Sequence, residues 1–405
     1  MPSGSRPAPP AVDDIGRGRA GALRAVRSSG RGRAVVVGGG ILGTWHALEL
    51  VEAGFSVDHL EAEAGTTGAS VRNFGLVWVS GRRSGAELDV ARRARRRWEE
   101  VGTEVPGIGF RPMTSLTVAG DAAARTVMEE FAQGPDATAR GITFLEPDEA
   151  RARNPAVRGD ITGALHCAED AVVEPRLALG ALRAHLSEVH GSRYRFHPTC
   201  RIVRAEPNAL VDTTGFKWEG DLLVLATGVA YDHLPGAEAV APRLRRVRLQ
   251  MLQTAPFATT LTTSLADADS LRYYPAYEAA ALDRLGPQSP VAAEHHLQLL
   301  LVQRPDGGLT IGDTHAYEEP FDFALSEDPT TELLERARRI LGVDVPPVQR
   351  RWEGVYAECI DGAVCLREQV APGVWLVTGP GGRGMTCAPA IARDTLEAAV
   401  AHVPT

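Results

Sequence analysis

The stretch AVVVGGGILG, residues 34–43, places a short apolar run directly before the glycine pattern G-x-G-x-x-G. A β-branched run that breaks into this pattern predicts a strand, a tight turn and the start of a helix. Glycines are needed there for the turn, for close approach of the backbone to a pyrophosphate, and for contact between helix and strand. We therefore expect dinucleotide phosphates to bind at Gly38, Gly40, Ile41 and Leu42, with Gly43 packed under the helix.

The residues that follow complete the unit. A helical segment runs from about Leu42 to Ala53, Gly54 ends it, and Phe55 to Leu60 forms the next strand, which leads into Glu61. A carboxylate at the end of the second strand accepts hydrogen bonds from a ribose hydroxyl. NAD and FAD share the adenosine and pyrophosphate, so Glu61 leaves both open.

Composition limits the class of protein. The chain has 405 residues, enough for two domains, with 44% apolar and 23% charged residues and a formal charge of -8. This charge argues against a nucleic-acid binder, and we find no apolar run suited to a signal peptide or a membrane span. The five cysteines include no C-x-x-C pair, and the adjacent His295 and His296 would point to opposite faces of a strand. We expect a cytoplasmic protein without a metal site.

The organisation along the chain indicates two interleaved domains. Residues 1–33 are rich in Pro, Gly, Ser and Arg, which predicts a disordered extension. An arginine-rich helix from Ala86 to Val101 is expected to present a solvated face. The run Leu222 to Ala226 has the continuous apolar character of a buried parallel strand, and strand-like runs between Pro242 and Arg351 suggest an antiparallel sheet.

A second glycine-rich turn follows the last predicted strand, Val374 to Thr378. The fold class expected from these patterns is α/β plus α+β, with a Rossmann-like nucleotide domain interleaved with an antiparallel-sheet substrate domain. The nucleotide domain would comprise residues 34–82, 150–239 and 353–405, and the substrate domain residues 83–149 and 240–352.

Four motifs together resemble the D-amino-acid oxidase and sarcosine oxidase superfamily of FAD enzymes. They are the first glycine turn with Glu61, the loop GASVRNFG (68–75), the strand end LATG (225–228), and GGRGMT (381–386). Within that superfamily, ASVRNFG (69–75) together with GLTIGDTH (308–315) resembles the branch associated with phosphonate catabolism.

The resemblance implies a flavin held by segments from both ends of the chain. The first turn would hold the pyrophosphate, the loop after Gly68 would lie near the ring system, and the C-terminal glycines would lie near the pyrimidine edge. Sarcosine oxidases tether their flavin through a cysteine two residues before a site tyrosine, whereas the matching segment here is Gly354-Val355-Tyr356, so we expect non-covalent FAD. Beyond the first turn, the expected cofactor contacts are Glu61, Ala62, Ser70, Arg72, Asn73, Phe74, Ile202, Thr227, Gly228, Gly381, Gly382, Gly384, Met385 and Thr386.

The implied reaction is oxidative deamination: a hydride passes from carbon to flavin, and the imine is hydrolysed. Gly81-Arg82 resembles the segment whose arginine holds the substrate carboxylate in sarcosine oxidases. Their second carboxylate partner is a lysine in the C-terminal loop, which Thr386 replaces here, with Arg383 three residues earlier; this change favours an aminophosphonate such as 2-aminoethylphosphonate or its N-methyl form. In sarcosine oxidases a lysine is associated with the reaction with oxygen, and Thr310 takes its place here. If oxygen is the acceptor, the positive charge would have to come from Arg383, His315 or another arginine. The expected catalytic residues are Arg82, Tyr273, His315, Tyr356 and Arg383.

Two alternatives remain open at this stage. The chain could be an amino-acid oxidase that takes a carboxylate substrate such as sarcosine, glycine or a D-amino acid. It could also be a flavin protein without turnover of its own, or a dehydrogenase subunit that passes electrons to a partner instead of oxygen.

Overall fold

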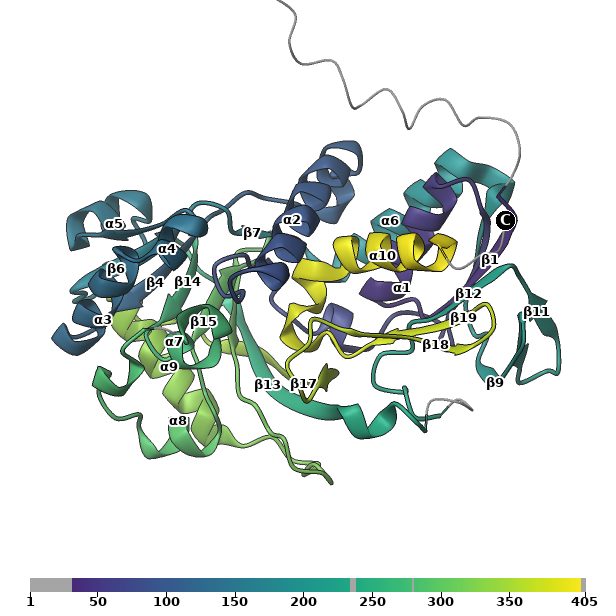
Figure 1. The fold of residues 1–405 in the computed structure, drawn as a ribbon. Helices are drawn as coiled ribbons and strands as arrows, with labels where there is room; N and C mark the ends of the chain where they lie inside the picture. Colours follow the sequence, from purple (N-terminus) through teal and green to yellow (C-terminus); the bar gives the residue numbers. More distant parts are fainter. Residues whose placement is uncertain (1–30, 234–237, 279, 402–405) are drawn as a thin grey trace, which may run out of the picture.

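The computed structural model of the chain describes residues 31–233, 238–278 and 280–401. The predicted extension, residues 1–33, lies outside the described residues except for its last three. Two large sheets organise the rest, one on each side of the molecule in Figure 1. None of the helices in the described ranges combines the length and apolar character needed to cross a bilayer.

The first sheet has six strands in the order β18-β19-β12-β1-β2-β8. Its neighbours pair in parallel except β18 with β19, so the apolar runs at its centre are buried on both faces. This is the predicted Rossmann-like sheet. Its strands are β1 (Arg33–Val37), β2 (Ser56–Leu60), β8 (Tyr194–His197), β12 (Leu222–Leu225), β18 (Leu366–Ala371) and β19 (Val374–Thr378).

Four helices pack around this sheet, and α10 lies between α1 and α2. Trp45 on α1 meets Trp98 on α2 edge to face, with ring centroids 4.7 Å apart. The Trp98 indole donates to the Met385 carbonyl at 2.9 Å, which ties α2 to the first turn of α10. The helices are α1 (Ile41–Glu52), α2 (Ala86–Glu104), α6 (Pro175–His190) and α10 (Gly384–Ala401).

The second sheet has eight strands in the order β17-β13-β16-β15-β14-β4-β6-β5. All of its pairs are antiparallel except β14 with β4, as expected for the substrate domain. Its strands are β4 (Ser115–Ala119), β5 (Ile142–Leu145), β6 (Gly163–Cys167), β13 (Leu244–Pro256), β14 (Ser264–Asp267), β15 (Leu300–Gln303), β16 (Gly308–Gly312) and β17 (Val348–Cys359).

Shorter elements complete the chain. Six helices accompany the second sheet: α3 (Ala122–Ala132), α4 (Pro135–Ala139), α5 (Pro147–Arg153), α7 (Ser270–Tyr273), α8 (Pro290–Glu294) and α9 (Glu327–Leu341). Two small sheets join β9 (Ile202–Glu206), β10 (Ala209–Asp212) and β11 (Lys217–Glu219), and β3 (Leu76–Val77) with β7 (Ala171–Val172).

Two strands of the second sheet, β6 and β17, do not fit the domain limits that were expected from the sequence. Residues 150–239 were assigned to the nucleotide domain, but β6 within them pairs with β4 and β5 in the second sheet. The limit at residue 353 also falls inside β17, which pairs with β13 along its whole length. At its far end β17 meets the C-terminal glycine loop through a bridge between Glu358 and Pro380, so this strand connects the two sheets.

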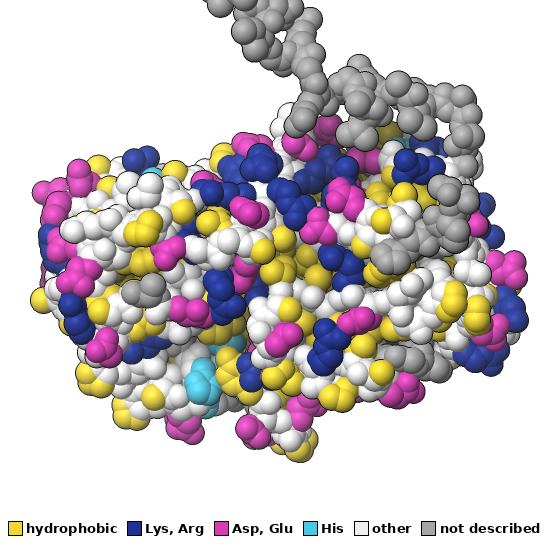
Figure 2. Space-filling model, viewed as in Figure 1, with side chains coloured by type: hydrophobic (Ala, Val, Ile, Leu, Met, Phe, Trp, Pro, Cys, Tyr) yellow, Lys and Arg dark blue, Asp and Glu magenta, His cyan; other side chains and the backbone are white. Residues whose placement is uncertain are grey.

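The arginine-rich face of α2 is paired rather than simply solvated. Arg92 bonds Glu169 at 2.6 Å, Arg93 bonds Asp394 at 2.6 Å, and Arg97 bonds Glu49 at 3.0 Å. Figure 2 shows basic and acidic side chains side by side over this helix. The prediction missed this because the partners lie on other helices and loops, far away in the sequence.

Candidate active site

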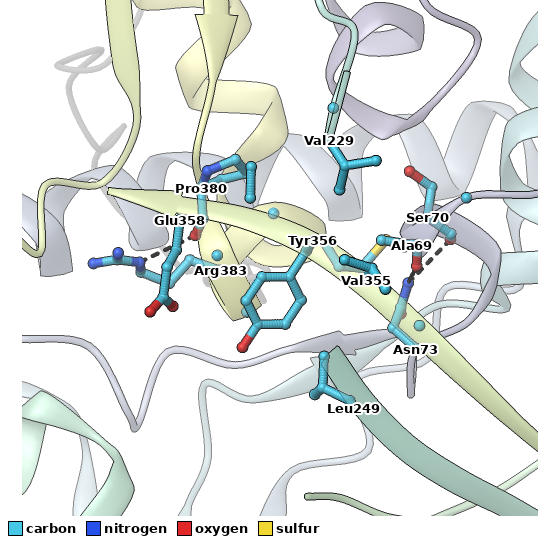
Figure 3. Close-up of a pocket in the computed structure, with 18 of the residues that line it drawn as sticks. Ala69, Ser70, Asn73, Val229, Leu249, Val355, Tyr356, Glu358, Pro380 and Arg383 are labelled. Carbon is cyan, nitrogen blue, oxygen red and sulfur yellow. Dashed lines mark hydrogen bonds between the residues drawn. The ribbon is translucent and has the colours of Figure 1, made fainter. Parts of the chain in front are cut away.

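One cavity of about 1170 Å³ lies between the two sheets. Its wall is formed by the first glycine turn, the loop after Gly68, the end of β12, the middle of β13 and β17, and the C-terminal glycine loop. Segments from both ends of the chain therefore meet at one space, as the resemblance implied. Figure 3 shows the Tyr356 ring between Glu358 and Arg383 on one side and the loop carrying Ala69, Ser70 and Asn73 on the other.

The first glycine turn has the geometry of a phosphate site. Gly38 has φ +109°, and a Cβ on Gly43 would lie 1.8 Å from the Gly38 carbonyl oxygen, so neither position accepts a side chain. Helix α1 begins directly after Gly40, which has no capping side-chain hydrogen bond, and Gly40, Ile41 and Leu42 lie on the cavity wall. This leaves the positive end of the helix available to an anion.

Glu61 and Ser70 complete this end of the cavity. The Glu61 carboxylate accepts from the Gly39 N–H at 2.6 Å and from the Glu63 N–H at 2.9 Å. The Ser70 hydroxyl accepts from the Ile41 N–H at 2.9 Å. Backbone bonds thus hold both side chains beside the turn, where a ribose and a pyrophosphate would lie.

The loop after Gly68 is fixed by its own side chains. Asn73 donates to the Ala69 carbonyl at 2.9 Å and accepts from the Gly75 N–H at 2.7 Å. Arg72 donates to the Thr67 and Glu353 carbonyls at 2.7 and 2.9 Å. These bonds give Arg72 and Asn73 a role in shaping the wall of the cavity.

Most of the predicted cofactor residues lie on this wall. Gly43 does not, because it is packed beneath the turn against Gly38. Thr386 does not either: its hydroxyl accepts from the Trp78 N–H at 2.9 Å and is buried against β3. The structure places the others on the wall: Gly38, Gly40, Ile41, Leu42, Glu61, Ala62, Ser70, Arg72, Asn73, Phe74, Ile202, Thr227, Gly228, Gly381, Gly382, Gly384 and Met385.

Arg82 is a buried cation on the wall at the other end of the cavity. Its side chain is 3% exposed, its Nε donates to the Trp78 carbonyl at 3.0 Å, and its Nη1 lies 3.9 Å from the Glu87 carboxylate. The guanidinium carbon lies 5.6 Å from the centre of the Tyr274 ring. No hydrogen bond engages Nη2 within the described ranges, so this nitrogen is available to a ligand.

Tyr273 and Tyr356 form a pair on the wall beside the C-terminal loop. Their hydroxyl oxygens lie 3.1 Å apart, and a Cβ on Gly382 would lie 3.6 Å from the Tyr273 hydroxyl and 3.8 Å from that of Tyr356. Burial raises the pKa of both phenols well above the ordinary value, so both remain protonated donors at neutral pH. The structure therefore brings these two predicted residues together.

Of the two residues expected to supply charge, His315 is neutral, whereas Arg383 remains a cation whose N–H donors are engaged by backbone carbonyls. The His315 ring stacks behind Tyr273 with centroids 4.2 Å apart and is not on the cavity wall; burial lowers its pKa to about 4, so it is neutral. Arg383 is on the wall, but its guanidinium donates to the carbonyls of Pro380, Gly362 and Ala363 at 3.2, 2.8 and 3.0 Å. Figure 3 shows this guanidinium extending away from Tyr356.

Three further residues of the site are Asp313 and Gln298, which were missed from the sequence, and Tyr274, which was passed over in favour of the adjacent Tyr273. All three lie on the wall, at 5%, 2% and 8% exposure. Burial raises the pKa of Asp313 to about 7. The available signal was the motif GLTIGDTH, in which Asp313 is the one acid directly after an apolar strand, but the prediction selected His315 from the same motif.

These residues fit FAD. A helix N-terminus with a flanking hydroxyl suits the pyrophosphate, a fixed carboxylate suits the ribose, and the second glycine loop places backbone close to the tyrosine pair. No cysteine of the described ranges lies on the cavity wall.

Comparison with known proteins agrees with this geometry. The family model described as DAO, FAD dependent oxidoreductase, matches residues 33–398. A subunit of opine oxidase from Rhizobium meliloti is 24% identical over 384 residues, which is 89% of this chain and 94% of that protein.

Solved structures share the fold at low sequence identity. Glycine oxidase from Geobacillus kaustophilus superposes with a TM-score of 0.73 at 18% identity, covering 93% of this chain and 96% of that one. L-Proline dehydrogenase from P. horikoshii superposes with a TM-score of 0.72 at 17% identity, covering 91% and 93%.

Proposed function

The chain belongs to the DAO family of FAD dependent oxidoreductases, and from this premise we propose that it oxidises the carbon–nitrogen bond of a small amine that also carries an acidic group. The observation that supports this proposal is Arg82, a buried guanidinium on the cavity wall with Nη2 free of protein partners in the described ranges. A buried cation of this kind favours an anionic ligand group.

The parts of the site have separate roles in this proposal. FAD, when bound, supplies an acceptor for the hydride that leaves the carbon next to the nitrogen. Arg82 holds the acidic group of the substrate, and Tyr274, whose ring lies beside the guanidinium, limits where that group can sit. The tyrosine pair Tyr273 and Tyr356 provides protonated hydroxyls beside the C-terminal loop.

For the acidic group we propose a phosphonate, as in 2-aminoethylphosphonate or its N-methyl form. A phosphonate offers three oxygens to guanidinium donors, and Arg83 and Arg272 also lie on the wall near Arg82. Arg83 is paired with Glu278 at 2.6 Å and Arg272 with Asp269 at 3.2 Å, which reduces their pull on an anion. A carboxylate remains the alternative, since one free guanidinium edge suits it as well.

Anaerobic reduction of the bound flavin tests the proposal. The panel is 2-aminoethylphosphonate, its N-methyl form, glycine, sarcosine, D-alanine and, without an acidic group, propylamine. We expect the phosphonates to reduce the flavin at the lowest concentrations. Arg82→Met should raise their half-saturating concentration about 100-fold, because a charge-assisted bond is lost, and change propylamine by less than about threefold.

Arg201→Met is the matched control, because Arg201 lies on the same wall at the nucleotide end and pairs with Glu63 at 2.6 Å. This variant should leave the half-saturating concentrations of both phosphonates unchanged. If glycine, sarcosine or D-alanine reduces the flavin better than the phosphonates do, the acidic group of the substrate is a carboxylate and not a phosphonate. If no amine in the panel reduces the flavin, the proposal of amine oxidation is wrong.

A second candidate is a dehydrogenase subunit that passes electrons to a partner. The relative from Rhizobium meliloti is named as a subunit, and Thr310 stands where sarcosine oxidases have the lysine associated with oxygen. Thr310 accepts from Arg304 at 2.7 Å, and Arg304 in turn faces Glu174 at 3.4 Å. Reoxidation of the reduced flavin faster by ferricenium than by air-saturated buffer would favour this candidate, and the reverse would favour an oxidase.

We also propose that the flavin is not covalently attached, since no cysteine of the described ranges lies on the cavity wall. Cys359, near Tyr356 in sequence, is buried against the backbone of Gly379. Acid precipitation should leave the flavin in the supernatant, and a yellow pellet would contradict the proposal.

A further inference from the structure

Asp313 and Gln298 face the cavity as a directly opposed pair. The Gln298 N–H donates to the Asp313 carbonyl at 3.1 Å, and the Asp313 N–H donates to the Gln298 carbonyl at 2.9 Å. Residues that exchange both backbone bonds lie directly opposite each other, with their side chains on the same face. Both side chains are on the cavity wall, and this places a carboxyl and an amide side by side there.

Tyr274 links this pair to Arg82. Its hydroxyl lies beside the Gln298 side chain. Burial raises the pKa of this phenol, and the interaction with Gln298 lowers it in part. The other side of its ring lies near the Arg82 guanidinium, at 5.6 Å from the ring centre. The wall therefore runs from a buried cation, past one aromatic ring and one amide, to a buried carboxyl.

No cation balances Asp313 among the described residues. Its Oδ1 has no hydrogen-bond partner there, and its Oδ2 lies 3.8 Å from the Nε2 of His315. His315 is neutral, because burial lowers its pKa to about 4; the hydrogen bond between its Nδ1 and the His296 carbonyl at 3.0 Å acts in the opposite direction and offsets this only in part. The other titratable groups that Asp313 influences are phenols whose pKa burial raises: Tyr273, Tyr274, Tyr317 and Tyr356.

We propose that Asp313 binds the ammonium group of the substrate and takes a proton from it, while Arg82 holds the acidic group. This inference rests on the proposed amine oxidation and adds that the substrate enters as a zwitterion with a fixed orientation. A buried carboxylate without a counter-ion is costly, and an ammonium would supply the missing charge.

The proton and electron balance is complete with the cofactor of the family. An N–H bond of the ammonium breaks and its proton moves to an Asp313 oxygen, which leaves a neutral amine with a lone pair. The C–H bond would then break, its two electrons would leave as hydride to the acceptor that bound FAD supplies, and the nitrogen lone pair would form the second carbon–nitrogen bond of an iminium ion. Because burial raises the pKa of Asp313 to about 7, its carboxylate accepts a proton readily near neutral pH.

Asp313→Asn in the flavin-loaded protein tests the inference with three ligands. Ethylphosphonate has the acid without the amine, propylamine has the amine without the acid, and 2-aminoethylphosphonate has both. Binding is measured by perturbation of the flavin spectrum, and reduction is measured anaerobically between pH 5 and 10. The binding arm needs no turnover.

The variant should lose propylamine binding by at least about tenfold, because a charge-assisted bond is removed. It should bind ethylphosphonate as tightly as the unmodified protein or tighter, because a like charge has gone. The reduction rate at low substrate concentration should rise near pH 7 in the unmodified protein, where Asp313 ionises. In the variant, the rate should instead rise at the pH where the free amine loses its proton, at about pH 10.

Retained propylamine affinity together with an unchanged pH profile would overturn the inference while leaving amine oxidation intact. Asp313→Glu keeps the carboxyl and should restore part of the propylamine binding. If Asp313→Asn does not fold, the unmodified protein decides the matter, because propylamine binding must then weaken below pH 7; binding that is constant from pH 5 to 8 would overturn the inference. The proposed amine oxidation has its own test: it is wrong if no amine reduces the flavin, whatever the result for Asp313→Asn.

Discussion

The two ends of the cavity differ in how their polar groups are satisfied. At the nucleotide end, each oxygen of Glu61 accepts a backbone N–H, and Ser70 accepts another. At the substrate end, the Gln298 Oε1 and the Asp313 Oδ1 belong to buried side chains on the cavity wall, and neither has a hydrogen-bond partner in the described ranges. Groups left unsatisfied in a folded protein concentrate where a ligand completes them, so the first end is built in advance and the second awaits its ligand.

The largest effect is expected from breaking the nucleotide end with Gly43→Ala. The new Cβ would lie 1.8 Å from the Gly38 oxygen, so the turn and α1 must move apart. We expect less than about a tenth of the normal flavin content and a loss of about 1–3 kcal/mol in the free energy of unfolding. Flavin absorbance per protein and urea denaturation measure these quantities.

Gly180→Ala is the control for this prediction. Gly180 lies within α6, and a Cβ there meets nothing within 4 Å. The variant should keep its flavin and gain up to about 1 kcal/mol of helix stability. A full flavin load in Gly43→Ala would show that the turn tolerates a side chain.

Acid should weaken the nucleotide end through His59. Its Nε2 donates to the Gly38 carbonyl at 2.9 Å and its Nδ1 accepts from the Tyr194 hydroxyl at 3.0 Å, so the neutral ring satisfies both partners. Burial lowers the pKa of His59 to about 4, from 6.5. The unfolded chain therefore binds a proton that the folded chain refuses, and stability is lost as pH falls from 6.5 toward 4.

At pH 5 this one group accounts for a loss of about 2 kcal/mol relative to pH 7.5. His59→Gln should lower stability at pH 7.5 but reduce the difference between the two pH values by about that amount, as measured by urea denaturation. An unchanged difference would mean that other groups carry the acid sensitivity. His46, whose pKa burial also lowers to about 4, is the first of these.

The smallest effect is expected at the substrate end, from Glu87→Gln. The Glu87 carboxylate lies 3.9 Å from Arg82 and 3.6 Å from Arg383, and it competes with an anionic ligand for both. Removing its charge should tighten ethylphosphonate binding about fivefold, measured by titration of the flavin spectrum. Glu278→Gln, at the exposed pair with Arg83, should change it by less than about twofold. Weaker binding in Glu87→Gln would instead show that Glu87 positions Arg82.

Much of the fold could be predicted because the signals are local. The run Ala34 to Val37, the glycines after it and Glu61 lie within one short segment, and their spacing reflects the geometry of a single strand–turn–helix unit. The strand β17 was missed because its start, VQRRWE, is charged, and only its pairing with β13 makes it a strand.

The substrate end was harder to predict for a related reason. Arg82 and Tyr356 were selected through the resemblance, and Tyr273 was selected as one of two adjacent tyrosines. The structure places all three on the cavity wall. His315 was selected from the same motif as Asp313, but one packs behind Tyr273 and the other faces the cavity. Nothing in the motif itself distinguishes these orientations, since they depend on which side chains the neighbouring strands supply.

The sequence by itself therefore determined the class of fold, because the strand, the glycine turn and Glu61 lie within one short segment. The family and FAD followed from the resemblance carried by four motifs spread along the chain. Only the tertiary structure decided which charges are free. The N–H donors of Arg383 are engaged by three carbonyls, Arg92 and Arg93 on α2 are paired with acids far away in the sequence, and Asp313 has no cation among the described residues. A side chain's charge is available to a ligand only where folding leaves it uncompensated, and that balance is a property of the assembled cavity.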